Sequence, residues 1–482
     1  MTHFDTPQTI CCFGIARRDI TPPIGMYHRM WGAATHDRST GIHRPLTTTA
    51  VALQAGADEN SRCVLVAIDH CLLMSPEMTR LKERVCLAAS ILPQDLVVTF
   101  SHTHAAGLLD LGRHQLPGGE MMLPYMQELI EEVTDAVQEA LDLMRPATIA
   151  YAAGTCSLAT HRDFWDEERH RFVCGFNPHQ AADQTVWLAR VNNGRGDLLA
   201  TLVNYACHPT TLAWKNNEIS PDYPGAMREV VELATGVPCV FLQGASGDLG
   251  PRNGFVGDPA VADANGRQLG YAALSALESL PPPATRMRYR GPVESGATLG
   301  EWGHESLEES ERLSKSRWRS RSWTVELPYR GDLDRADSAN SELVGLEEAE
   351  QQAQSGDDPV KEQQLRASAE RARRRQARLS QLPLGKYPYR MVLWHLGDAF
   401  WLSIEGEPYS LLQQELRSRF PQTPILVTTL IEGWLPGYLP PRDLYGKGIY
   451  QESIALLEPG TLERVIEIAS QEIARWLQPE GS

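Results

Sequence analysis

Apolar residues follow two different spacings along the first 280 residues. Short runs rich in β-branched residues predict strands at 9–16, 45–54, 63–69, 96–100, 148–159, 185–192, 200–207 and 237–242. Apolar residues three or four positions apart predict helices at 77–89, 123–143, 224–233 and 265–280. Strands that alternate with helices in this way are typical of α/β folds.

The pattern changes at about residue 300 and returns after Pro383. Residues 301–382 are rich in Glu, Arg, Ser and Gln, and we expect an acidic helix at 342–354 and a basic helix at 360–382. An antiparallel charged hairpin is the natural arrangement, either solvated and packed on one face or serving as a lid or subunit contact. The later pattern predicts strands at 389–396, 399–404 and 425–430 and helices at 410–420 and 461–477.

These elements predict an α/β fold in which mixed sheets are flanked by helices and a charged helical hairpin is inserted. We expect residues 1–300 and 383–482 to form one catalytic domain and residues 301–382 to form a charged, mainly helical insertion. Ligands of open α/β sheets gather outside the strand ends, so we expect the active site in strand-end loops.

Composition and charge narrow the classes of partner. The chain has 482 residues, 42% of them hydrophobic, which is ample for a large core, and a formal net charge of −16. That charge argues against nucleic acid and anionic membrane surfaces as partners, because both are bound by clustered Lys and Arg. No run approaches the ~20 apolar residues of a membrane span, so we expect no stable membrane insertion.

The cysteines and the N-terminus predict the compartment. Nine cysteines are scattered without a CxxC spacing, which favours a reducing environment over a disulfide framework. The polar start, residues 1–8, is followed by an apolar piece too short for a secretion signal. We therefore expect a soluble, cytoplasmic protein; the sequence leaves a homo-oligomer open.

The stretch Ser101-His102-Thr103-His104 ends an apolar, β-branched run. If it continues a strand, His102 and His104 project to the same side, because strand side chains alternate between faces. Two neighbouring imidazoles suit a divalent metal, most often zinc. A hydrogen-bonded histidine pair, or one ligand and one bystander, explains the same motif equally well.

Three further strand ends carry chemically useful groups. His208 follows the strand at 200–207, Glu405 and Glu407 flank Gly406, and Tyr438 lies in a loop rich in Gly and Pro. Each of them alone also fits a structural role in a loop or turn. Other catalytic motifs are incomplete, since 244–247 is one residue short of the G-x-S-x-G nucleophile elbow and neither a phosphate-binding loop nor H-E-x-x-H occurs.

Several segments together resemble the neutral/alkaline ceramidases. They occur in the order of that family, span about residues 10–460, and comprise 14–22, 41–46, 101–104, His208, 247–251, 404–407 and 437–445. The last resembles the family pattern G-Y-x-[TP]-x-x-x-x-[YF]. The resemblance implies a zinc hydrolase that cleaves a linear amide bond of an N-acyl compound.

The resemblance also implies roles for individual residues. Two His, one Glu and one Tyr hold one catalytic zinc per chain in the family, and these ligands correspond to His102, His208, Glu407 and Tyr438. His104 would lie beside the metal as a proton shuttle. The catalytic residues that the resemblance implies besides His104 are Arg162, in contact with the substrate, and Tyr450, a second active-site tyrosine.

Other residues are candidates to support this site. We expect Asp222 and Asp248 to orient a ligating histidine. Backbone amides of residues 244–250, together with Arg162, are candidates to stabilise an oxyanion or carbonyl. The partner expected from these roles is a small-molecule N-acyl or amide substrate.

The chain departs from the family at three points. Gly250 stands where the family has a serine implicated in catalysis, so a mechanism that uses that hydroxyl does not apply unchanged. The C-terminal immunoglobulin-like domain and the secretion signal of the full-length ceramidases are not expected in a chain of this length. The alternatives to an amide hydrolase are therefore a zinc esterase or lactonase on the same fold, or a non-catalytic binding protein.

Overall fold

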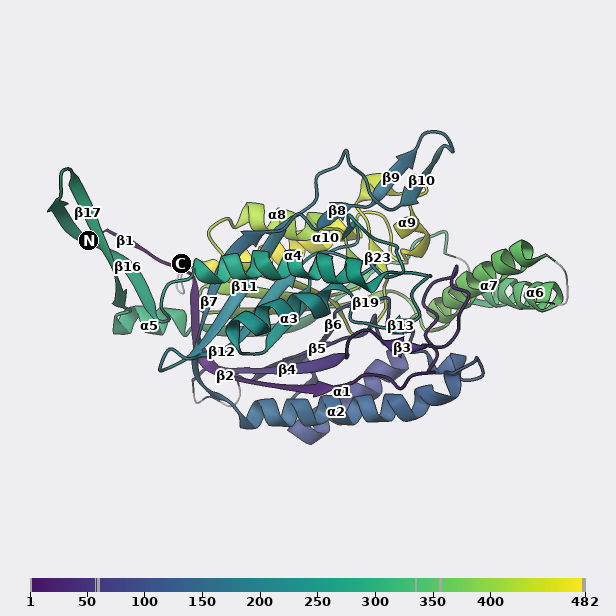
Figure 1. The fold of residues 1–482 in the computed structure, drawn as a ribbon, viewed down its shortest axis with the longest axis horizontal. Helices are drawn as coiled ribbons and strands as arrows, with labels where there is room; N and C mark the ends of the chain where they lie inside the picture. Colours follow the sequence, from purple (N-terminus) through teal and green to yellow (C-terminus); the bar gives the residue numbers. More distant parts are fainter. Residues whose placement is uncertain (1, 57, 59–60, 334–335, 355–357, 479–482) are drawn as a thin grey trace.

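The largest sheet has eight strands that run in mixed directions (Figure 1). In spatial order its strands are β14 (Cys239–Gln243), β12 (Leu198–Tyr205), β11 (Thr185–Asn193), β7 (Arg145–Thr155), β2 (Gln8–Asp19), β4 (Thr47–Gln54), β5 (Cys63–Ile68) and β6 (Leu96–Phe100). The pair at each edge, β14 with β12 and β5 with β6, is parallel. The computed structural model describes residues 2–56, 58, 61–333, 336–354 and 358–478.

A second, four-stranded sheet packs against one face of the first. Its strands, in order, are β18 (Trp318–Leu327), β19 (Tyr387–Leu396), β20 (Ala399–Glu405) and β22 (Ile425–Ile431). The core between the two sheets includes Trp394 and Trp401 from the smaller sheet and Phe13 and Leu202 from the larger one. Because β22 also contacts β6 and β14, the loops that follow these three strands are brought close together.

Helices cover the outer face of each sheet. On the large sheet these are α1 (Ser75–Ala89), α2 (Met122–Asp142), α3 (Tyr223–Thr235) and α4 (Pro259–Glu278); on the small sheet they are α8 (Leu411–Arg419) and α10 (Thr461–Leu477). Each buried Leu or Val of such a helix contributes roughly 1.5–3 kcal/mol. The resulting order of layers is helix, sheet, sheet, helix, which confirms the predicted mixed sheets flanked by helices.

Two parts project from these layers at opposite ends (Figure 1). One is a three-stranded ribbon of β1 (His3–Phe4), β16 (Thr285–Glu294) and β17 (Thr298–Ser306), next to the short helix α5 (Glu309–Lys315). The other is the hairpin of α6 (Ala336–Gln354) and α7 (Pro359–Ser380). The sequence did not predict the ribbon strands, because β17 is exposed along most of its length and lacks alternating apolar residues.

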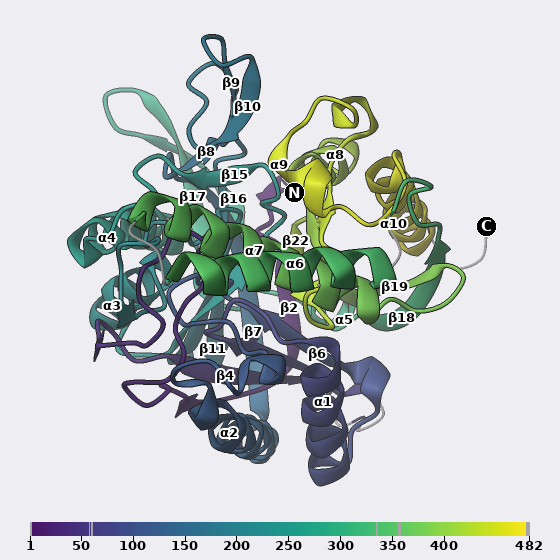
Figure 2. The same cartoon turned by 90° about the vertical axis from the view of Figure 1, so that its right-hand side faces the viewer.

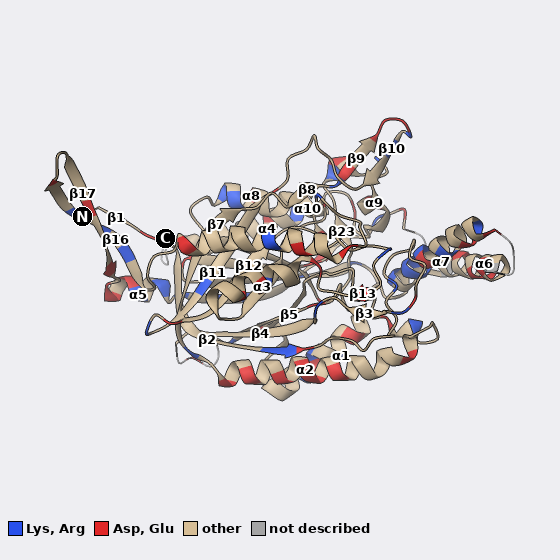
Figure 3. Ribbon diagram, viewed as in Figure 1, with Lys and Arg blue, Asp and Glu red and all other residues tan. Residues whose placement is uncertain are grey.

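The segment 301–382 is less uniformly helical than we expected. β18 pairs with β19 along all ten of its residues, so 318–327 is part of the second sheet. The helical part is confined to α5 and to the hairpin of α6 and α7. The hairpin itself is confirmed as an antiparallel charged pair (Figure 3), whereas the division into a catalytic domain and an insertion stays a prediction.

Helix α7 is packed against the rest of the molecule rather than solvated on all sides. In Figure 2 the hairpin crosses in front of the sheets. Buried Glu370 of α7 accepts a 2.8 Å bond from Arg113, and Arg374 donates to the carbonyl of Met30. Burying a charged side chain costs free energy unless it is paired, so this paired network specifies how α7 docks.

Candidate metal centre

Four predicted residues from separate loops converge on one point. His102 lies two residues after β6, and His208 lies three residues after β12. Glu407 begins β21 (Glu407–Pro408), and Tyr438 begins β23 (Tyr438–Leu439). The loops meet because the strands before them are packed together through β22.

The polar atoms of the four side chains lie within contact distance. Glu407 Oε2 is 3.2 Å from His102 Nε2 and 2.9 Å from His208 Nε2, and the three ligand atoms all lie within 4.8 Å of one another. The Tyr438 hydroxyl is 3.2 Å from His208 Nε2. Two nitrogens, a carboxylate oxygen and a phenol oxygen thus face one small volume.

The tautomers of the two histidines follow from backbone contacts. His102 Nδ1 lies 2.8 Å from the carbonyl oxygen of Cys71, and His208 Nδ1 lies 2.7 Å from that of Ser246. A carbonyl can only accept, so each Nδ1 carries the proton and each Nε2 presents a lone pair to Glu407. Acceptors that face one another need a proton or a metal ion between them, and this donor set fits a divalent metal such as zinc.

The charges of these side chains also favour a positive charge at this position. Burial alone raises the pKa of Glu407, but His102 and His208 outweigh it and hold that pKa well below its usual range. Burial lowers the pKa of His102, yet Cys71 and Glu407 raise it well above normal. In the absence of a metal ion, a proton on His102 would therefore supply the positive charge that Glu407 requires.

Local backbone geometry places the ligands. His102 has φ +67°, in the left-handed region that costs a non-glycine residue energy, so packing around the loop must hold it there. Gly406 has φ +70°, and a Cβ there would lie 2.6 Å from the Gly437 carbonyl oxygen. The glycine thus permits the close approach of the segments that carry Glu407 and Tyr438.

His104 lies beside the cluster, but alternation along a strand is not what places it there. Strand β6 ends at Phe100, so His102 and His104 are in a loop and not in a strand. Their Nε2 atoms are 3.5 Å apart, and the ring of Trp31 lies 5.3 Å from that of His104. Burial, with His102 and His208, holds the pKa of His104 well below its ordinary value.

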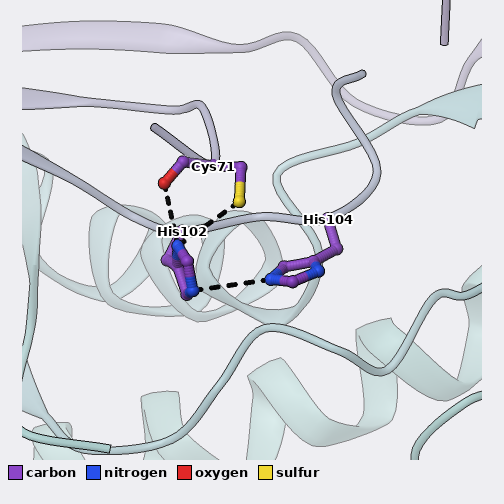
Figure 4. A group of neighbouring side chains, drawn as sticks. All are labelled: Cys71, His102 and His104. Atoms are coloured by element: carbon purple, nitrogen blue, oxygen red, sulfur yellow. Dashed lines mark hydrogen bonds between the residues drawn. The ribbon is translucent and has the colours of Figure 1, made fainter. Parts of the chain in front are cut away.

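Cys71, which sequence reasoning missed, forms a second group with these two histidines (Figure 4). Its carbonyl and sulfur both face His102 Nδ1, whereas His104 faces Nε2 on the opposite side of the ring. Cys71 and His104 therefore lie on opposite sides of the His102 imidazole, and the three residues do not face a common centre. Cys71 orients a ligand candidate, and its position after the strand at 63–69 was the one signal in the sequence.

Arg162 and Tyr450 also lie at the cluster. Arg162 donates from Nε and Nη2 to the carbonyl of Gly247, and its guanidinium lies 5.3 Å from the centre of the Tyr438 ring. The half-exposed ring of Tyr450 lies 5.8 Å from that of Tyr438, edge to face. The structure thus brings all seven predicted site residues together, and their individual roles stay predictions.

Two supporting expectations were wrong. Asp222 accepts from the amides of Leu212 and Tyr223, and Asp248 accepts from Ser410, so neither orients a ligating histidine. Backbone carbonyls do so instead, and a sequence cannot identify them because every residue has one.

The proposed oxyanion amides are mostly occupied. The amides of Gly244, Ala245, Gly247 and Leu249 already donate within the protein, to Tyr205, Gln413, Pro408 and Ser246 respectively. They hold the loop that supports His208 and Glu407, and they are not available to a substrate.

Comparisons with known proteins agree with this fold. Residues 12–247 match the family described as neutral/alkaline non-lysosomal ceramidase, N-terminal. A solved structure described as a ceramidase complexed with C2 has 14% identity and a TM-score of 0.63, over 98% of this chain and 76% of that one. The neutral ceramidase from Pseudomonas aeruginosa has 15% identity and a TM-score of 0.63, over 98% and 75%. No curated protein matches the sequence. The family resemblance is confirmed, and at these identities the structural likeness shows the fold.

Proposed function

We propose that this chain, whose residues 12–247 match the N-terminal domain of the neutral/alkaline non-lysosomal ceramidases, is a zinc-dependent hydrolase of linear amide bonds. Its substrate is a small N-acyl or amide compound. The observation that carries the proposal is the convergence of His102 Nε2, His208 Nε2 and Glu407 Oε2 beside the Tyr438 hydroxyl.

Each residue of the chain has a defined task in this proposal. His102, His208, Glu407 and Tyr438 would hold one zinc ion per chain, and such an ion polarises a carbonyl and activates water. The carbonyls of Cys71 and Ser246 keep both imidazoles in the binding tautomer. His104, outside the ligand set, would move a proton at Nε2, and Arg162 holds the loop at Gly247 beside Tyr438.

The wider properties of the chain are consistent with a small-molecule enzyme. No helix among the described residues is long and apolar enough to cross a membrane. All nine cysteines are unpaired, which supports our proposal of a cytoplasmic, reducing location.

The proposal is tested by metal analysis combined with hydrolysis assays. Purified protein should contain about one zinc per chain, as a four-ligand site would hold, and should cleave an N-acyl amide faster than its zinc-free form. His208→Ala should lose the metal and the activity together. A matched ester, assayed in parallel, distinguishes an amidase from an esterase.

A control keeps this test specific. His395 lies in the second sheet, stacked on Phe400 at 4.1 Å and away from the cluster, so His395→Ala should keep the zinc. A His208→Ala protein that retains its zinc, or a zinc-loaded wild type that cleaves neither substrate, would contradict the proposal.

A further inference from the structure

Arg378, on helix α7, is a buried cation without a partner anion. Arg378 is only 9% exposed. Among the residues that the structure describes, none accepts a hydrogen bond or forms an ion pair with its guanidinium. The guanidinium lies 5.8 Å from the centre of the Trp434 ring, and contact with an aromatic face uses none of its five N–H donors.

Three other arginines of α7, Arg373, Arg374 and Arg375, are paired. Arg374, one turn earlier, donates to Glu370 at 2.7 Å and to the Met30 carbonyl. Arg373 pairs with Glu347 at 2.6 Å, and Arg375 pairs with Glu342 at 3.1 Å. The pairs of these three arginines thus account for the docking of α7. The N–H donors of Arg378 take no part in these pairs.

Arg378 lies within electrostatic range of the candidate metal centre. The groups that interact with its charge are Tyr450, Arg374, Glu407 and Tyr438. Its aromatic neighbour Trp434 lies between β22 and β23, in the segment that leads to Tyr438. Helix α7 therefore places a guanidinium against the segment that leads to Tyr438 and within electrostatic range of Glu407.

A buried cation in this position requires compensation. Burial lowers the pKa of Arg378 to about 10, so the group is still charged at neutral pH. Removing a charge from water costs free energy unless a partner restores its hydrogen bonds, and a second positive group, Arg374, lies nearby. An incoming anion would supply what the described residues do not.

We propose that Arg378 recognises an anionic group on the substrate, so that amides carrying a carboxylate or phosphate are preferred over matched neutral amides. This inference rests on the proposed function, because it names the substrate class of the same site. A planar guanidinium binds either group through two parallel N–H···O bonds, which gives both attraction and orientation.

Matched substrates test the preference. N-octanoylglycine and N-octanoylethanolamine phosphate carry the anion on the amine side, the ethanolamide of suberic acid carries it on the acyl side, and N-octanoylethanolamine is neutral. For at least one anionic compound, kcat/KM relative to the neutral amide should fall roughly ten- to a hundredfold in Arg378→Met, the range expected when a charged hydrogen-bonding partner is lost. Comparison of the three anions identifies carboxylate or phosphate, and the side of the amide bond.

Two further variants separate recognition from structure. Arg378→Lys keeps the charge and should retain part of the preference. Arg375→Met, on the outer side of the same helix and paired with Glu342, should leave the ratio unchanged. If Arg378→Met folds and keeps the wild-type ratio for every anionic compound, the inference is wrong.

A binding measurement distinguishes failure of the inference from failure of the proposed function. Calorimetric titration of the zinc-loaded protein with N-octanoylglycine should show affinity that falls in Arg378→Met. Binding that depends on Arg378, with no hydrolysis of any amide, would overturn the proposed function and support anion recognition. Amide hydrolysis that depends on Arg378 neither in the kinetics nor in the binding would support the proposed function and overturn anion recognition.

Discussion

Glu407 and Tyr438 are register partners in a parallel ladder only two residues long, formed by β21 and β23. The amide of Glu407 donates to the carbonyl of Gly437 at 2.9 Å, so the spacing between the two side chains is set by the backbone. This relationship joins two segments about thirty residues apart in the chain. A substitution in either strand should therefore shift the positions of both Glu407 and Tyr438.

The carboxylate of Glu407 should be required for metal binding. Glu407→Gln replaces a charged ligand by a neutral amide, and we expect zinc affinity to fall by more than the roughly 100-fold that loss of an outer-shell partner costs. Competition with a chelator of known affinity measures this change. Glu405→Gln is the matched control, because burial raises the pKa of Glu405 well above normal and an amide resembles its protonated form. Equal zinc affinity in the two variants would contradict the assignment.

Gly247 and Gly250 should differ sharply in their tolerance of a side chain. A Cβ at Gly247 would lie 2.6 Å from the Glu407 carbonyl oxygen, so Gly247→Ala must displace the backbone that carries Glu407 and should weaken zinc binding. A Cβ at Gly250 would meet its nearest atoms, in Arg162 and Thr210, at 3.8 Å. Gly250→Ala should change the free energy of unfolding by less than about 1 kcal/mol. Zinc content and thermal unfolding should be measured for both variants. Equal losses of zinc and of stability in Gly247→Ala and Gly250→Ala would refute this explanation.

Breaking the buried pair of Glu370 and Arg113 should loosen helix α7. Glu370→Gln removes the buried anion that pairs with Arg113 and Arg374 and leaves Arg113 with Asp110. Breaking a buried pair typically costs 3–5 kcal/mol, and the hairpin should become sensitive to protease. Glu347→Gln, at a half-exposed pair with Arg373, should cost less than about 1 kcal/mol. Denaturant unfolding and limited proteolysis measure both effects.

The same pair predicts how stability depends on pH. Burial raises the pKa of Glu370, but Arg374 and Arg113 outweigh it and hold that pKa well below normal. Because the pKa is depressed in the folded state, this stabilisation is present above the unfolded pKa and is lost as the pH falls through the folded one. The stability gap between wild type and Glu370→Gln should therefore narrow in acid. A gap that is constant with pH would argue against an ionised Glu370.

Asp222 should give a pH dependence of opposite sign. Burial raises its pKa to about 6, against about 3.9 in an unfolded chain. The related stabilisation is full below the unfolded pKa and is lost as the pH rises through about 6; two pKa units correspond to about 3 kcal/mol. Relative to Asp222→Asn, the wild type should lose stability between pH 4 and pH 6. Parallel unfolding curves across that range would contradict the raised pKa.

Local patterns predicted most of the fold but not its exposed parts. The strands that form β5 and β6 are buried on both faces and therefore form nearly continuous apolar runs in the sequence. β16 and β17 lie in a projecting ribbon and carry no such pattern, so they were missed. The periodicity that reveals an element is produced by burial, and it disappears where an element is not buried.

The sequence by itself determined the layered α/β fold and the residue types at the candidate centre. His102, His208, Glu407 and Tyr438 could be named because the segments that contain them resemble, in order, those of a known family. Only the tertiary structure decided that backbone carbonyls of Cys71 and Ser246, and not Asp222 or Asp248, orient the imidazoles. It also placed Arg378 of a charged hairpin against Trp434, within electrostatic range of Glu407 and Tyr438. Such contacts join residues far apart in the chain, and packing between layers, which no local pattern encodes, brings them together.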